Sequence, residues 1–204
     1  MEFCKKKEEN CLAPYCKERE IGNVYTYLAH KRETDFFVCF KTGKWNEQTC
    51  DEFYELLSKK LRFPTKKRRL DIFSDGNKQN FTAIINHFSK NSINYGIRKK
   101  VKIDGKIVGV VNKIIYGNIS KDEIRINHID GFCSKLRERI SCFTRKARSF
   151  AKRKATLDDR LEIFSVQHNF IEKKLGKTPA MKEGLISKPI TWEIFFHRRL
   201  SILN

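Results

Sequence analysis

The order in which hydrophobic patterns follow one another is the strongest constraint on the fold of this chain. Residues 24–31 (VYTYLAHK) and 35–40 (DFFVCF) are rich in β-branched and aromatic side chains, which predicts two strands joined by a short loop. A third short strand is expected after the TGK turn at 42–44. Residues 51–61 (DEFYELLSKKL) carry apolar side chains at helical spacing and acids in the first turn, which predicts a helix that Pro64 ends.

Strands and helices continue to alternate beyond this point. Residues 70–77 (LDIFSDGN) form a short apolar run that stops at Asp75–Gly76, and residues 81–90 (FTAIINHFSK) have helical spacing. Two β-rich runs, 99–103 and 106–117, flank an Asp-Gly turn and predict an extended hairpin.

The last third of the chain is predicted to be helical. We expect one helical stretch over about 127–154 with a break, a second over about 157–175, and a short amphipathic helix over about 191–200. A strand meander followed by a helix, and then by a strand ending in a carboxylate, is the layout of an RNase H-like sheet. We therefore predict an α/β fold: an RNase H-like mixed sheet flanked by helices, with a basic β-hairpin and a helical C-terminal part.

The charge of the chain points to an anionic partner. A formal net charge of +19 over 204 residues causes self-repulsion, which binding to nucleic acid relieves by releasing counterions. The alternative is a lysine-rich composition with solvated lysines on every face. No apolar run approaches eighteen residues, and the charged start MEFCKKKEEN has no signal-peptide pattern, so we expect a soluble, cytoplasmic protein with no membrane partner.

The seven cysteines are expected to be reduced thiols, since their number is odd and no secretory signal is present. Cys4, Cys11 and Cys16 lie close together in the sequence, but a zinc site normally uses paired CxxC motifs, which are missing. Unpaired thiols, or the remainder of an upstream zinc ribbon, are therefore favoured over a zinc site here.

Two aspartates are candidates for a metal-dependent phosphodiester site. Asp75 ends an apolar strand and is followed by Gly76, and Asp130 stands where a basic helix begins. Carboxylates from different elements can hold divalent ions that stabilise the attacking and leaving oxygens together. The alternative for each residue is simpler: Asp75 as a turn or cap residue, and Asp130 as a helix cap.

Five segments resemble insertion-sequence transposases of the DDE type, in particular the insertion-sequence-1 type and its archaeal relatives. They are 72–77 (IFSDGN), 106–117 (KIVGVVNKIIYG), 129–153 (IDGFCSKLRERISCFTRKARSFAKR), 164–171 (FSVQHNFI) and 176–196 (GKTPAMKEGLISKPITWEIFF). The resemblance implies a charged arm over 1–20, an RNase H-like catalytic core over 21–155 and a C-terminal helical extension of the same domain over 156–204. It further implies Mg²⁺ or Mn²⁺ as cofactor.

The chain departs from the family pattern at its acidic positions. Where the resembled family has its first acid, this chain has Gly22, which has no side chain. Where the family has glutamate as its third acid, this chain has the shorter Asp130. Glu20 lies two residues earlier, a shift of about 6–7 Å along an extended strand. Asp75 and Asp130 are therefore the predicted catalytic residues, and Asp75, Asp130 and Glu20 the candidate metal ligands.

A run of cations after Asp130 is the predicted DNA-binding surface, interpreted as a helix with a cationic face. Such phosphate contacts give affinity with little sequence specificity, and the alternative is a solvated charged face. The predicted DNA-binding residues are Lys135, Arg137, Arg139, Arg145, Lys146, Arg148, Lys152, Arg153 and Lys154.

Three functions are compatible with these features. The first is a transposase that cleaves and transfers DNA strands, acting on terminal inverted repeats and target DNA as a homo-oligomer. The second is an inactive transposase remnant that only binds DNA and can regulate a full-length transposase by pairing with it. The third is a basic RNA-binding or ribosome-associated protein.

Overall fold

The computed structural model describes residues 2–4, 22–144, 151 and 153–202, and these form two compact units. Unit 1 contains the described residues of Met1–Val24, Leu28–Phe40 and Arg137–Asn204. Unit 2 contains Tyr25–Tyr27 and Lys41–Leu136. The two units are described separately below, and the predicted part boundaries at residues 20 and 155 stay predictions.

The sheet of unit 2 has three strands, β4 (Leu70–Ser74), β5 (Ile93–Ile103) and β6 (Lys106–Tyr116), in the order β4-β5-β6. Strand β4 runs parallel to β5, and β5 runs antiparallel to β6. Parallel neighbours need a crossover connection, and here α3 (Lys78–His87) lies between β4 and β5 in the chain. The result is a mixed sheet.

Helix α2 (Glu47–Lys60) begins four residues earlier than the sequence pattern predicts and packs against α3. The side chain of Asn46 accepts a hydrogen bond from the Thr49 backbone N–H at 2.9 Å, which satisfies one of the N–H groups that a helix start leaves unpaired. The expected third short strand after the TGK turn is wrong, because this cap starts the helix three residues after β3 ends.

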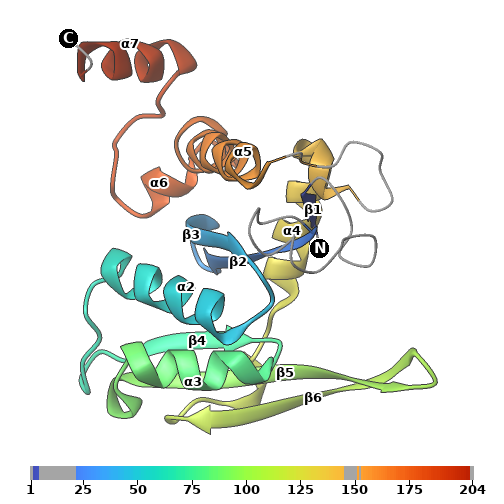
Figure 1. Ribbon diagram of the computed structural model, residues 1–204. Helices are drawn as coiled ribbons and strands as arrows, with labels where there is room; N and C mark the ends of the chain where they lie inside the picture. The colour runs from blue at the N-terminus through green and yellow to red at the C-terminus, as the bar shows by residue number, and fades with distance from the viewer. Residues whose placement is uncertain (1, 5–21, 145–150, 152, 203–204) are drawn as a thin grey trace. The chain divides into compact units, whose positions relative to one another are not determined.

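The β5–β6 hairpin extends well beyond the rest of its sheet (Figure 1). Strand β4 pairs only with Ile93–Ile97 of β5, whereas β5 and β6 remain paired as far as the turn at Asp104–Gly105. Several apolar side chains of this distal part are exposed, including Ile103 at 61% and Ile107 at 57%. The distal hairpin is therefore a two-stranded ribbon without a covering layer of its own in unit 2.

The strands β1 (Glu2–Cys4), β2 (Gly22–Lys31) and β3 (Phe36–Gly43) pair in the order β1-β2-β3 and belong mostly to unit 1, apart from Tyr25–Tyr27 of β2 and the end of β3. Strand β1 pairs antiparallel with the start of β2, with Cys4 opposite Gly22. The sequence pattern predicts β2 and β3, and both are confirmed, although β2 also contributes its central residues to unit 2. Strand β1 falls in the predicted arm, and the pattern gives no sign of it.

The helical stretches predicted over 127–154 and 157–175 are shorter in the structure, and the helix that begins the first of them lies mainly in unit 2. Helix α4 (Asn127–Arg139) ends where Ile140 adopts an extended backbone, and a 3₁₀ turn follows at Ser141–Phe143. Helix α5 (Lys154–Val166) runs directly into a π-helical turn, η5 (Gln167–Ile171). The break expected within 127–154 therefore falls at Ile140, whose side chain is buried, and the predicted 157–175 helix ends at Ile171.

Two further helices complete unit 1, α6 (Pro179–Lys182) and α7 (Trp192–Ile202). The TPAM motif starts α6, because the Thr178 hydroxyl caps the Met181 backbone N–H and Pro179 occupies the first helical position, where its missing N–H costs nothing. No helix among the described residues has the length and apolar character needed to cross a bilayer. The chain is a mixed α/β protein, and the RNase H-like arrangement stays a prediction.

Candidate functional site

Asp75 stands immediately after β4 with an exposed side chain. Its Oδ1 accepts a hydrogen bond from the Asn77 backbone N–H at 3.2 Å, which shapes the turn into α3. Gly76 adopts a φ of +78°, and a Cβ there would lie 3.2 Å from Ile97 of β5. Glycine tolerates this left-handed conformation without a steric penalty, so the turn holds Asp75 close to β5.

The negative charge of Asp75 contributes to the raised pKa of three ionisable groups of unit 2. Burial raises the pKa of the Tyr95 hydroxyl to about 12, and Asp75 adds to this rise, while a hydrogen bond from Ser74 opposes it. Burial also raises the pKa of Tyr27 to about 12 and that of the Cys50 thiol to about 11, again with a contribution from Asp75. The Asp75 carboxylate therefore lies at the edge of a buried cluster of hydroxyls and a thiol.

These raised values predict loss of stability in alkali. The folded pKa of Tyr27 and Tyr95 exceeds the ordinary value of 10.0, so the unfolded chain releases its protons first as the pH rises. The stabilisation is complete below pH 10 and is lost as the pH rises to about 12. Urea unfolding at a series of pH values, together with phenolate absorbance, should show this fall, and it should be shallower in Tyr27→Phe. Complete ionisation of the tyrosines near pH 10 in the folded protein would contradict it.

Asp130 lies in the first turn of α4, where the helix dipole favours a negative charge. Its side chain is 59% exposed, and Oδ2 lies 3.4 Å from Nζ of Lys100 on β5. Ser74, the residue before Asp75, pairs with Ile97 of the same strand. Lys100 is three residues further along β5, about 10 Å in an extended strand. Both predicted catalytic aspartates thus flank one short stretch of β5 within unit 2.

The third candidate metal ligand, Glu20, lies outside the described residues. Gly22 is the first residue of β2 and pairs with Cys4. The described acids at the predicted site are therefore Asp75 and Asp130.

The predicted DNA-binding cations are divided among several elements. Lys135, Arg137 and Arg139 lie in the last part of α4, Arg153 precedes α5, and Lys154 begins it. Arg139 lies 3.4 Å from Glu172, and Lys154 lies 3.8 Å from Asp158, so each has an acidic neighbour. The remaining four, Arg145, Lys146, Arg148 and Lys152, lie outside the described residues.

Other cations gather on the β5–β6 hairpin. Lys99 lies next to Lys100 on β5, and Lys106 and Lys113 lie on β6, all four with exposed side chains. In the register, Lys99 faces Val111 and Lys100 faces Val110. Because successive side chains of a strand point to opposite faces, Lys99 and Lys100 lie on opposite faces of the ribbon. The hairpin therefore carries positive charge on both faces.

A histidine–aspartate cluster in unit 1 is absent from the sequence-based predictions. His30 of β2, Asp35 of the β2–β3 turn and His168 of η5 each place one possible ligand atom within 4.8 Å of the others. His30 Nε2 lies 2.8 Å from Asp35 Oδ1, and His168 Nε2 donates to the backbone oxygen of Asp35 at 2.7 Å. Only the tertiary fold brings His168 to the other two, so no sequence spacing signals the cluster.

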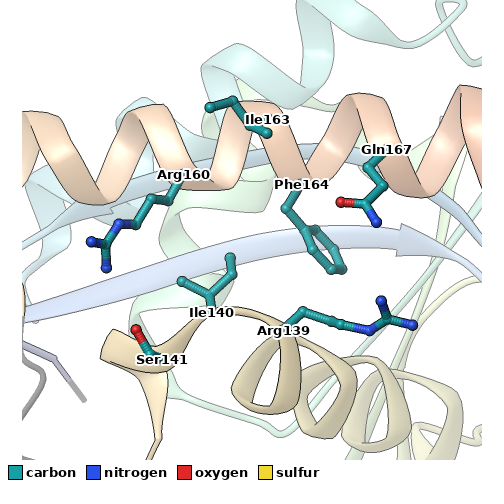
Figure 2. A pocket seen from close by; sticks show the side chains of 7 residues that line it. All are labelled: Arg139, Ile140, Ser141, Arg160, Ile163, Phe164 and Gln167. Atoms are coloured by element: carbon teal, nitrogen blue, oxygen red, sulfur yellow. The ribbon is translucent and has the colours of Figure 1, made fainter. Parts of the chain in front are cut away.

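A pocket of about 330 Å³ lies between α5 with η5 and the end of α4, and Figure 2 shows its lining side chains. Ile140, Ile163 and Phe164 provide apolar walls, with Arg139 and Arg160 at its rim. None of its lining side chains is a carboxylate, so this pocket does not supply the carboxylate ligands predicted for magnesium.

No protein-family model, no curated protein and no solved structure matches this chain. The candidate site is therefore interpreted from its own residues. The resemblance to insertion-sequence transposases rests on the sequence motifs alone.

Proposed function

We propose that the chain is a transposase that binds duplex DNA through the β5–β6 hairpin and cleaves it with Asp75 and Asp130. The observation that carries this proposal is the position of both aspartates beside the same stretch of β5, at the base of a ribbon with exposed lysines on both faces. DNA phosphates held by the ribbon would then lie near the two carboxylates.

The shape and charge of the hairpin support the DNA-binding part of this proposal. The major groove of B-DNA admits a two-stranded β-ribbon, and lysines along such a ribbon attract phosphates without selecting a sequence. The exposed apolar side chains Ile103 and Ile107 near the tip suit contact with sugars or thymine methyl groups.

The two aspartates support the catalytic part. Exposed carboxylates are the oxygen ligands that magnesium takes, so Asp75 and Asp130 would hold it, and the ion would stabilise the attacking and leaving oxygens of the phosphodiester. The Lys100 ammonium beside Asp130 offsets the negative charge of that carboxylate. It can also pair with a DNA phosphate as it enters the site.

A second candidate function is DNA binding without cleavage, by an inactive transposase remnant. Gly22, at the position of the first acid, has no side chain to complete a three-carboxylate site. Under this alternative the lysine ribbon still binds duplex DNA, and Asp130 serves to pair with Lys100 and to begin α4.

The test measures binding and nicking on one labelled duplex that carries the terminal repeats flanking the reading frame. We expect tight binding that weakens steeply with salt, and nicking that needs Mg²⁺, in the wild type or after Gly22→Asp. Asp75→Asn should lower the nicking rate about 100-fold or more, equal to a barrier increase of about 2.7 kcal/mol. Lys99→Ala/Lys106→Ala should reduce the salt slope of binding by about 1.8, if each lysine contacts one phosphate.

The matched control for the hairpin variant is Lys59→Ala/Lys60→Ala, which removes two exposed lysines from the end of α2. Its salt slope should stay at the wild-type value. Salt-dependent binding without nicking in either the wild type or Gly22→Asp would support the DNA-binding remnant. Equal salt slopes for the hairpin variant and its control would contradict the assignment of the ribbon as the DNA contact. Tighter binding to structured RNA than to duplex DNA would contradict both proposed functions.

A further inference from the structure

We propose that His30, Asp35 and His168 form a binding site for a divalent transition metal, with zinc as the best fit. The site lies wholly within unit 1 and uses none of the residues assigned to DNA cleavage. It is therefore independent of the proposed function and can be tested without DNA.

The geometry of the three side chains is close to that of a metal centre. Their ligand atoms lie within 4.8 Å of one another, and the ligands of one tetrahedral zinc ion lie about 3.3–3.5 Å apart. Closing this difference requires the ligand atoms to approach one another by at most about 1.5 Å. His30 Nε2 and Asp35 Oδ1 already lie 2.8 Å apart in a hydrogen bond, and a metal ion would displace the shared proton and hold the two atoms slightly further apart.

The donor set favours a transition metal over magnesium. Two imidazole nitrogens and one carboxylate are typical ligands of zinc and similar ions, whereas magnesium prefers oxygen donors alone. Three protein ligands leave a fourth position for a solvent molecule. The His30 side chain is only 1% exposed, while that of Asp35 is 32% exposed, so the ion would reach the site from the Asp35 side.

The surroundings of Asp35 permit this entry. Nζ of Lys174 lies 3.9 Å from Asp35 Oδ2, and the Lys174 side chain is 74% exposed, so it can move into solvent as the ion enters. Asp35 itself has a φ of +64°, a conformation that aspartate adopts more readily than most residues. This backbone turns the carboxylate and the carbonyl of one residue towards His30 and His168 respectively.

A bound ion would link segments that lie far apart in the chain. His30 and Asp35 bracket the β2–β3 turn, and His168 comes from the π-helical turn η5. Wide or π-type turns inside helices occur frequently at functional sites. Since binding requires the folded arrangement, the metal should stabilise unit 1.

The experiment uses the full chain, freed of metal with a chelator and then titrated with Zn²⁺ or Co²⁺. At free Zn²⁺ about 100-fold above Kd, Tm should rise by about 5–10 °C. Imidazole ¹⁵N spectra should show that two of the five histidines shift on addition of Zn²⁺. The Co²⁺ form should show visible absorption without a thiolate charge-transfer band, because the proposed ligands include no cysteine.

The variants His30→Gln and His168→Gln should abolish the zinc-dependent rise in Tm. The control is His87→Gln. His87 Nε2 lies 3.1 Å from Asp51 Oδ1, so it forms a similar histidine–aspartate pair, but this pair is not part of the His30–Asp35–His168 cluster. That variant should keep the full rise. A thiolate band, or histidine spectra that do not respond to Zn²⁺, would overturn the proposal even if the His30 and His168 variants failed to fold.

Discussion

Replacing Asn169 by alanine is expected to lower the free energy of unfolding by about 2–5 kcal/mol. The Asn169 amide makes two hydrogen bonds to one backbone residue of β3: its Oδ1 accepts from the Phe37 N–H at 2.9 Å, and its Nδ2 donates to the Phe37 carbonyl at 2.8 Å. The side chain thus pairs with β3 as a neighbouring strand would.

The large effect follows from burial. Phe37 is 2% exposed and Asn169 is 4% exposed, so alanine would remove two hydrogen bonds from buried backbone groups, and each such loss costs about 1–3 kcal/mol. Urea unfolding followed by circular dichroism measures the change. The π-helical backbone of η5 puts Asn169 in this position, which gives the HNF segment at 168–170 a structural role in joining η5 to β3.

The control is Asn86→Ala, which removes an exposed asparagine that bonds Asp51 at 2.8 Å. Both groups of that pair can turn to water instead, so its loss should change the free energy by less than about 1 kcal/mol. Similar effects for Asn169→Ala and Asn86→Ala would show that the amide pairing with β3 contributes little.

Gly117→Ala should destabilise the protein by a similar amount, about 2–5 kcal/mol. Gly117 has a φ of +84°, and a Cβ there would lie 2.8 Å from the Cα of Asn94, a backbone atom that cannot swing aside. The Asn94 side chain is held as well, since it donates to Asp71 at 2.7 Å and accepts from the Asn118 N–H at 3.2 Å. The left-handed backbone and the clash therefore add.

Gly105→Ala separates these two contributions. Gly105, in the β5–β6 turn, has a φ of +76°, but a Cβ there meets nothing within 4 Å. The Gly105→Ala substitution should lower the free energy of unfolding only by the backbone strain, about 1–2 kcal/mol. The difference in free energy between Gly117→Ala and Gly105→Ala then measures the cost of the steric clash. The midpoints of thermal and urea unfolding provide both values, and equal losses for the two variants would mean that the strand beside Gly117 yields to the extra methyl group.

Local patterns in the sequence predicted most of the regular elements. Val24 and Phe37, both 2% exposed, lie in runs whose aromatic and β-branched residues indicate strands, and the paired strands β5 and β6 follow from an Asp-Gly turn between two β-rich runs. These signals are local, because strand and helix periodicity are properties of neighbouring residues. Asp75 at the end of β4 and Asp130 at the start of α4 could likewise be located from the pattern alone.

The local pattern predicts a break within 127–154 but does not locate it at Ile140. The segment around it has enough arginine, lysine and leucine to continue a helix, yet Ile140 is 6% exposed in an extended backbone. Burial of one apolar side chain outweighs a difference in helix propensity of a few tenths of a kcal/mol per residue. Packing of Ile140, and not helix propensity, therefore determines where α4 ends.

The sequence by itself determined the strand and helix types, the positive charge and the two aspartates, because each depends on residue identity and near neighbours. Tertiary structure alone decided which of these meet: the approach of Lys100 to Asp130, the pairing of Asn169 with Phe37, and the cluster of His30, Asp35 and His168. Apart from the His30–Asp35 pair, these contacts join residues 30 or more positions apart, and they form only when burial of the intervening chain offsets its loss of conformational entropy.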